Sequence, residues 1–401
     1  MLIQFTIENH RSIRDSAVIS FSASKDKSLE SYLLRPDEKK TLLPALALYG
    51  ANAAGKSNVL HALMTMRDMV VGNASRISKG QELPWEPFGD TTMQTAFEAV
   101  FIYNNIRYAY GYTFDSKKIY SEYLYHWPNG REALIFSREE DKYEFRENVN
   151  EQITLSNRTP DNKLYLVSSN DWNLPQTENA YKWFLEKLTF LMDQVPSSAE
   201  TIAQIVSGDE KKARILKELL LADLGISDVT IKNISGNKPT ITTTHRIIGE
   251  DGSVNHFQLL MEQESAGTQR YFARIGGWLQ ALENGAVLIV DEIEDSLHPL
   301  LTKRLIEMVQ DSNVNTKGTQ ILFTTHDAML LDLDFFRRDQ IWFAEKDDKS
   351  CATELYSLAS FSPRKGENVR KGYLQGRFGA IPFIGGDRLW QKCEKNMIQT
   401  K

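Results

Sequence analysis

The segment GANAAGKS, residues 50–57, has the residue types and the spacing that bind a polyphosphate. It fits GxxxxGK[ST], in which small residues let backbone N–H groups surround the phosphates at a helix N-terminus. Lys56 is expected to reach the outer phosphates, and Ser57 is expected to supply an oxygen ligand to Mg²⁺. The sequence therefore predicts a site for a nucleotide polyphosphate and magnesium.

A pair of acidic residues ends a later apolar segment, AVLIVDE, at residues 286–292. An apolar strand that ends in an acid would place Asp291 beside the magnesium held by Ser57, because Mg²⁺ prefers oxygen ligands. Glu292 is then placed to polarise an attacking water as a general base. A DE pair after an apolar strand is common by itself, and only its combination with the phosphate loop indicates hydrolysis.

Two further polar features accompany these motifs. His326 ends the apolar segment LFTTH, and a histidine in that place is often only a surface or capping residue. The parallel order of the strands nevertheless predicts it at the same sheet edge as Asp291, near a terminal phosphate. The segment ESAGTQR spaces Ser265, Gly267 and Thr268 like a second phosphate loop, although a turn or a helix cap would also fit.

These residues need a parallel sheet to bring them together, and the apolar runs supply its strands. Continuous apolar runs of strand length lie at 42–49, 286–290 and 319–324. Apolar residues at helical spacing follow the phosphate loop over 56–72. A second helix-like stretch separates the runs at 286–290 and 319–324. Alternation predicts a first strand at 2–8, an antiparallel meander over 97–145, and a strand with a hairpin over 339–358. The segments 179–195 and 199–226 are expected to be helical.

Composition narrows the class of protein. The 401 residues are 41% hydrophobic and 25% charged, as in an ordinary soluble protein. The net charge of -6 gives no general attraction to nucleic acid, although a local basic face is compatible with it. Cys351 and Cys393 have no metal-binding spacing and fit a reducing compartment. No signal peptide or membrane-spanning run is evident, so we expect a cytoplasmic protein without a membrane partner.

In chain order, the phosphate loop, ESAGTQR, LIVDEIEDSLHP and LFTTH resemble the motifs of ABC-type ATPases of the SMC, RecF and OLD group. The resemblance is closest to compact ATP-binding proteins of bacterial anti-phage defence, of the abortive-infection AbiL and RloA type, related to the ATPase of the PARIS system. FTIENHRSI, FEAVFIYNNIRYAYGY and YLQGRFGAIP extend it over nearly the whole chain. It implies an α/β fold with an ABC-type P-loop ATPase core, an antiparallel β lobe and a helical insertion.

The implied domains follow this order along the chain. Residues 1–95 form the N-terminal part of the ATPase core, and residues 96–165 form the antiparallel β lobe. Residues 166–235 form the helical insertion, residues 236–360 the C-terminal part of the core, and residues 361–401 a C-terminal extension.

The resemblance also implies roles for individual residues. Ser265, Gly267 and Thr268 match the signature loop, which grips the γ-phosphate of ATP bound to the opposite subunit, although Thr268 stands where Glu or Gln is usual. Ser57 and Asp291 would hold Mg²⁺, and Lys56, Glu292 and His326 would act in catalysis. Further residues are implied near the nucleotide or the dimer seam: Gly50, Asn52, Gly55, Asn58, Arg11, Ser12 and His298. His10 stands where an aromatic is usual, which weakens the match of Arg11 and Ser12. Gln81 and Gln94 are candidates for the Q-loop glutamine, which the resemblance does not place.

The function implied is that of an ATP-hydrolysing switch in an anti-phage, abortive-infection system. Its subunits would form a homodimer or a higher homo-oligomer through shared ATP sites and control a separate effector, a nuclease or a toxin. No TOPRIM-like acidic cluster follows LFTTHD, so the nuclease is expected in another polypeptide. The alternatives are a DNA-repair ATPase of the RecF or SMC kind, and a scaffold that binds ATP but hardly hydrolyses it. The basic segment 362–383 fits structural packing, a protein partner or nucleic acid.

Overall fold

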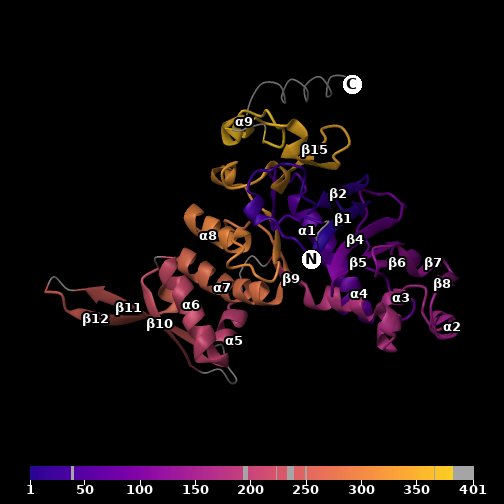
Figure 1. Cartoon of the computed structure of the whole chain (residues 1–401), viewed down its shortest axis with the longest axis horizontal. Helices are drawn as coiled ribbons and strands as arrows, with labels where there is room; N and C mark the ends of the chain where they lie inside the picture. Colours follow the sequence, from indigo (N-terminus) through magenta and orange to yellow (C-terminus); the bar gives the residue numbers. More distant parts are fainter. Residues whose placement is uncertain are drawn as a thin grey trace, which may run out of the picture.

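The computed structural model describes residues 1–37, 40–192, 197–222, 224–232, 239–248, 251–364 and 366–382. In these ranges the strands form three sheets, of seven, three and six strands. Figure 1 shows the seven-stranded sheet on the right, with the three-stranded sheet projecting far to the left. The fold is α/β, as the sequence predicts.

The six-stranded sheet is the core that carries the phosphate loop. Its order is β16-β15-β3-β14-β13-β9, and β3 pairs in parallel with both β14 and β15. Only β16 runs antiparallel to its neighbour. The strands are β3 (Ala45–Tyr49), β9 (Leu188–Leu191), β13 (Val287–Val290), β14 (Gln320–Thr324), β15 (Ile341–Lys346) and β16 (Thr353–Ser357).

Helices cover both faces of this sheet, which explains the continuous apolar runs of its central strands. In β3, Leu46 and Leu48 pack with α1 (Lys56–Val71) in one core, whereas Ala45 and Ala47 face the other. That second core contains Trp278 of α7 (Ala266–Asn284) and residues of α8 (Pro299–Gln310). The expected strand, loop and helix around residues 45–71 are confirmed.

The prediction of a helix over 179–195 is wrong at 188–191, and residues 193–195 lie outside the described residues. Helix α4 (Pro175–Glu186) ends early, and β9 then joins the core sheet beside β13, with Leu188 opposite Val287. The run LTFL is short and apolar, and periodicity does not distinguish such a run between helix and strand. Pairing with β13 decides the outcome.

The seven-stranded sheet confirms the antiparallel meander. Its order is β2-β1-β4-β5-β6-β7-β8, with helices α2 (Val149–Ser156) and α3 (Tyr165–Asp171) beside it. Trp183 of α4 stacks on Phe101 of β4, with ring centroids 4.1 Å apart. The strands are β1 (Leu2–Glu8), β2 (Ala17–Ser20), β4 (Thr95–Tyr103), β5 (Ile106–Phe114), β6 (Ile119–Trp127), β7 (Ala133–Glu139) and β8 (Lys142–Phe145).

A three-stranded antiparallel sheet, which the sequence patterns above do not predict, follows the expected helices α5 (Ala199–Ser207) and α6 (Asp209–Leu221). It consists of β10 (Ile226–Lys232), β11 (Thr240–Ile248) and β12 (Val254–Leu260). We call this sheet the arm, because Figure 1 shows β11 and β12 extending away from α6 and α7. The domain boundary expected at 235 falls between β10 and β11, which pair with each other.

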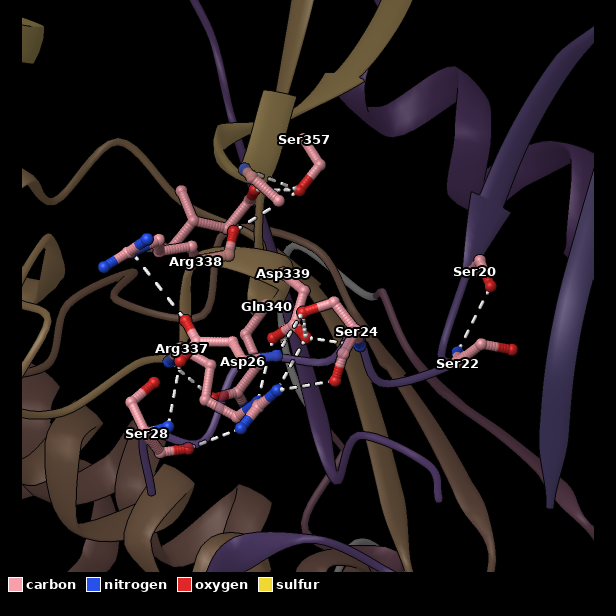
Figure 2. Close-up of polar contacts among 12 residues, drawn as sticks. Ser20, Ser22, Ser24, Asp26, Ser28, Arg337, Arg338, Asp339, Gln340 and Ser357 are labelled. Atoms are coloured by element: carbon pink, nitrogen blue, oxygen red, sulfur yellow. Dashed lines mark hydrogen bonds and ion pairs between the residues drawn. The ribbon is translucent and has the colours of Figure 1, made fainter. Parts of the chain in front are cut away.

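Buried Arg337 ties the segment after β2 to the residues that lead into β15 (Figure 2). Its guanidinium donates to both carboxylate oxygens of Asp339 at 2.9 Å, and to the carbonyls of Ser24 and Ser28. Asp339 also accepts from the backbone N–H and the hydroxyl of Ser24 at 2.8 and 2.7 Å. This network fixes the N-terminal sheet against the core sheet.

The remaining short elements are helical. Within the described ranges, no helix combines the length and the apolar character needed to cross a bilayer. The short elements are α9 (Val369–Leu374) and the 3-10 helices η1 (Glu30–Tyr32), η2 (Asn73–Arg76), η3 (Met261–Gln263), η4 (Ala328–Leu330), η5 (Arg338–Gln340) and η6 (Leu358–Phe361).

Candidate functional site

The phosphate loop connects β3 to α1, and residues of β15 and β16 lie close against its two glycines. A Cβ at Gly50 would lie 2.3 Å from the carbonyl oxygen of Ala344 in β15. Gly55 has a φ of 97°, and a Cβ there would lie 2.1 Å from the hydroxyl of Thr353 in β16. The two glycines of the motif are therefore required by backbone conformation and by space.

Lys56 lies folded over this loop. Its ammonium donates to the carbonyl oxygens of Gly50 at 2.9 Å and Ala51 at 3.1 Å, and the residue is 6% exposed. Burial lowers the pKa of Lys56, whereas the nearby carboxylates of Asp291 and Glu292 raise it. The cation is thus held where phosphates on the loop would meet it.

Ser57 and Asp291 meet as the sequence predicts, and a third residue joins them. The Ser57 hydroxyl donates to Asp291 Oδ1 at 3.1 Å, across 234 positions of sequence. The buried hydroxyl of Thr324, at the end of β14, donates to the same oxygen at 2.5 Å. A hydroxyl and a carboxylate fit Mg²⁺, which completes its shell with phosphate and water oxygens. Sequence reasoning missed Thr324, whose only signal is a polar side chain at the end of a buried strand.

Glu292 projects into solvent from a tightly held backbone. Its side chain is 60% exposed, and its backbone N–H donates to the Thr324 hydroxyl at 2.8 Å. Buried Arg274 of α7 donates to the carbonyls of Ile293 and Glu292 at 2.5 and 3.3 Å. The carboxylate is therefore free to meet a water while its main chain is fixed on two sides.

His326 lies beside this glutamate. Its Nε2 is 4.0 Å from Glu292 Oε1, and its backbone N–H donates to Glu294 Oε1 at 2.5 Å. Burial lowers the pKa of His326, and the charge of Lys56 lowers it further. A neutral imidazole near pH 7 can donate one hydrogen bond to a phosphate oxygen and accept another from water.

Glu292 and His326 open onto a groove of about 1460 Å³. Gly50, Asn52, Glu292 and His326 line one side, and the loop between β15 and β16 lines another together with the C-terminal segment. The aromatic residues of that segment pack inward: Tyr373 and Phe378 are buried and stack on Phe343. Of the three roles considered for the segment 362–383, these two side chains therefore have structural packing. Lys365, Phe383 and Cys393 lie outside the described residues.

The ESAGTQR segment forms the N-terminus of α7. Ser265 is exposed and caps the helix, since its hydroxyl accepts from the backbone N–H of Thr268 at 3.1 Å. Arg270 pairs with Asp295, and a Cβ at Gly267 would lie 3.0 Å from the carbonyl oxygen of Ser296. None of residues 265–268 is among the described residues that line the phosphate-loop groove, although Asp295, the partner of Arg270, does line it. The segment therefore lies beside the groove of its own chain and does not line it with residues 265–268.

Ser12, Asn58 and Arg11, which are predicted near the nucleotide, have different partners. The Ser12 hydroxyl accepts from the Asn58 amide at 2.7 Å and contacts the Thr353 hydroxyl at 2.7 Å. The Arg11 guanidinium donates to Glu86 at 2.6 Å. Ser12 therefore joins α1 to β16 beside the phosphate loop, whereas Arg11 pairs with a residue outside the loop.

The other candidates have structural contacts. His10 is buried, and burial followed by the charge of Arg11 lowers its pKa to about 4. His298 caps α8, since its Nδ1 accepts from the N–H of Leu300 at 3.3 Å. The side chain of Gln81 accepts from the N–H of Ser78 at 2.6 Å. Gln81 and Gln94 are both absent from the described residues that line the groove, so neither can be assigned as the Q-loop glutamine.

A glycine-rich loop between a buried parallel strand and a helix, with a buried lysine and a serine-aspartate pair beside it, defines a P-loop ATPase. A family model described as "AAA domain, putative AbiEii toxin, Type IV TA system" matches residues 45–334. Because this match spans more than half of the chain, the protein belongs to that family of ATPases. No curated protein matches the chain.

One solved structure that matches is cbiO1 from Clostridium perfringens, which is part of the ABC transporter complex cbiONQ. The match has 12% sequence identity and a TM-score of 0.35, and it covers 93% of this chain and 96% of that chain. A likeness of this degree carries no argument about function.

Proposed function

We propose that this protein is an ABC-type ATPase whose two subunits close head to tail around two ATP molecules. The observation that supports the proposal is the exposure of the predicted signature loop outside the phosphate-loop groove. Gly50, Asn52 and Glu292 line the groove, whereas Ser265 lies exposed at the start of α7 and does not line it. A second copy would supply the missing loop, so that ATP bridges the subunits.

In the closed state each residue has a distinct task. Lys56 binds the outer phosphates. Ser57 and Asp291 are the residues that would hold Mg²⁺, and the ion would supply positive charge beside the phosphate oxygens. Glu292 accepts a proton from the water that attacks the γ-phosphate. His326 donates a hydrogen bond to a γ-phosphate oxygen, and its lowered pKa keeps it neutral. Loss of the γ-phosphate removes the bridge and lets the subunits separate.

We further propose that this cycle serves as a switch in an anti-phage, abortive-infection system of the AbiL, RloA or PARIS type. The family description names a putative AbiEii toxin and a type IV toxin-antitoxin system, which supports this setting. A separate effector, a nuclease or a toxin, would respond to the nucleotide state. The trigger acts upstream of ATP turnover in this scheme.

Glu292→Gln tests the shared ATP site. Without its base the chain should bind ATP but hydrolyse it roughly 10² to 10⁴ times more slowly, and should elute as a closed dimer with ATP and Mg²⁺. Adding Ser265→Arg to Glu292→Gln should abolish this dimer while ATP binding persists, because the substitution blocks only the loop at 265–268 that would contact the ATP of the second subunit. Ser265→Ala is the milder control for the lost helix cap. A Glu292→Gln chain that stays monomeric with bound ATP contradicts the shared site.

A phage-plating assay tests the defence role. Cells that express the gene with its neighbouring open reading frames should survive infection in bulk culture better than cells that carry Lys56→Ala. Protection that persists with Lys56→Ala would contradict a nucleotide-driven switch. Strong stimulation of ATP hydrolysis by DNA would instead favour the DNA-repair alternative.

A further inference from the structure

Strand β12 is the outer strand of the arm. In the described part of the chain it pairs only with β11, over seven consecutive residue pairs without a register shift. Six of its seven residues are exposed, and Leu259 is half-buried. Figure 1 shows β12 lying away from the helices that cover the core. Its outer edge therefore has no strand partner among the described residues, although the Leu260 N–H donates to Gln263 Oε1 at 2.9 Å.

This edge lacks the features that normally prevent pairing between strands. Native edge strands carry lysine, proline, a bulge or an inward charge. The sequence VNHFQLL has none of these and exposes Val254 by 47%, Phe257 by 39% and Leu260 by 43%. Exposed apolar side chains on an unprotected edge favour the addition of another strand.

Side-chain contacts at β11 and β12 hold the edge strand in its conformation. The ring of Phe257 stacks on His245 of β11, with centroids 4.8 Å apart. Glu264, just before the helix α7, accepts from His245 Nε2 at 2.7 Å and from the Thr243 hydroxyl at 2.5 Å. The arm is thus anchored to the residues before α7, and adding another strand would cost little conformational entropy.

The sequence of β12 is largely complementary to itself. In an antiparallel pair centred on Phe257, this ring faces its own copy, and Val254 faces Leu260. His256 then faces Gln258, and only the pair of Asn255 with Leu259 sets a polar side chain against an apolar one. β12 has no Asp, Glu, Lys or Arg, so no like charges oppose each other.

We propose that β12 pairs with β12 of a second copy of this chain, about a two-fold axis at Phe257, and joins two arms into one six-stranded sheet. This association needs no nucleotide and therefore goes beyond the ATP-driven dimer. A protein with both interfaces would hold two chains together permanently while ATP closes and opens the other contact.

A cysteine scan tests the register in a full-length chain with Cys351→Ser and Cys393→Ser. Phe257→Cys should form a disulfide-linked dimer without nucleotide, because directly opposed Cα atoms lie roughly 4.5 to 5.5 Å apart. Val254→Cys alone should not, since its two copies would lie roughly 20 Å apart along the strands. Combining Val254→Cys with Leu260→Cys should restore the crosslink.

Light scattering on a sizing column tests the association without crosslinking. The nucleotide-free chain should have twice the mass of a monomer, and Phe257→Lys should reduce it to one. Leu185→Lys, at an exposed leucine of α4, is the matched control and should leave the dimer intact. Lys56→Ala should also leave it intact. The ATP-driven dimer of Glu292→Gln is then measured in the Phe257→Lys background, where the chain without nucleotide is a monomer, so the two contacts are tested separately.

Two results would overturn the proposal. One is a nucleotide-free chain that remains monomeric at high concentration. The other is a Val254→Cys chain that crosslinks as readily as Phe257→Cys. Either result would assign the edge of β12 to a strand of a different protein or to none.

Discussion

Thr324→Val removes one hydroxyl beside the proposed magnesium site at nearly constant volume. The Thr324 hydroxyl donates to Asp291 Oδ1 at 2.5 Å and accepts from the N–H of Glu292 at 2.8 Å, in a fully buried position. A lost hydrogen bond to a charged group costs about 1.5 to 3 kcal/mol, and the unpaired N–H adds about 1 kcal/mol or more. The proposed metal ligand Asp291 and the proposed general base Glu292 would both lose a contact that orients them.

Groups that orient metal ligands typically contribute a factor of about 10 to 100 in metal affinity or activity. We therefore expect the Mg²⁺ concentration for half-maximal ATP turnover to rise by roughly 10- to 100-fold in Thr324→Val. The assay is phosphate release at saturating ATP over a Mg²⁺ titration.

The matched control is Thr325→Val. Thr325 is also fully buried, but its hydroxyl accepts from the N–H of Asp327 at 3.0 Å. This substitution should lower stability and leave the Mg²⁺ dependence unchanged. Equal Mg²⁺ dependence in Thr324→Val and the unmodified chain, with both folded, would refute the orienting role.

Three further outcomes are expected. Gly50→Ala should weaken ATP binding by at least about tenfold in a nucleotide titration, because its Cβ would lie 2.3 Å from the Ala344 carbonyl. The buried His10 has a pKa of about 4 against 6.5 for the free side chain, so the unfolded chain gains a proton first as the pH falls. This lowers the free energy of unfolding by about 2 kcal/mol between pH 6.5 and about 5, and His10→Phe should remove that loss in denaturant titrations. Arg337→Met should cost about 3 to 5 kcal/mol in the same assay, because Asp339 would stay buried without its cation; an unchanged value would contradict the ion pair.

The parts of the site that the sequence predicts are those whose signal is local. Apolar runs of strand length set β3, β13 and β14, and the carboxyl ends of parallel strands meet at one edge. The pairing of Ser57 with Asp291 therefore follows from sequence patterns alone. The part played by Thr324 does not, because it depends on which oxygen its hydroxyl meets in space.

The arm and β9 escape prediction for different reasons. The run TITTTHRII is rich in β-branched residues and is followed by Gly252, which is a hairpin signal that could have indicated the arm. The run LTFL is too short to assign by period, and only its pairing with β13 makes it a strand. The network of Arg337 joins positions about 310 residues apart and has no local pattern at all.

The place of β3 between β14 and β15 sets the order of events during synthesis. Residues 45–49 leave the ribosome early, but both neighbouring strands lie beyond residue 319. At about 5 to 20 residues per second, β3 waits roughly 15 to 60 s for β15. A chain that ends before residue 320 would contain the phosphate loop but neither of the two strands that flank β3, so the loop is held in the sheet only once nearly the whole core has been made.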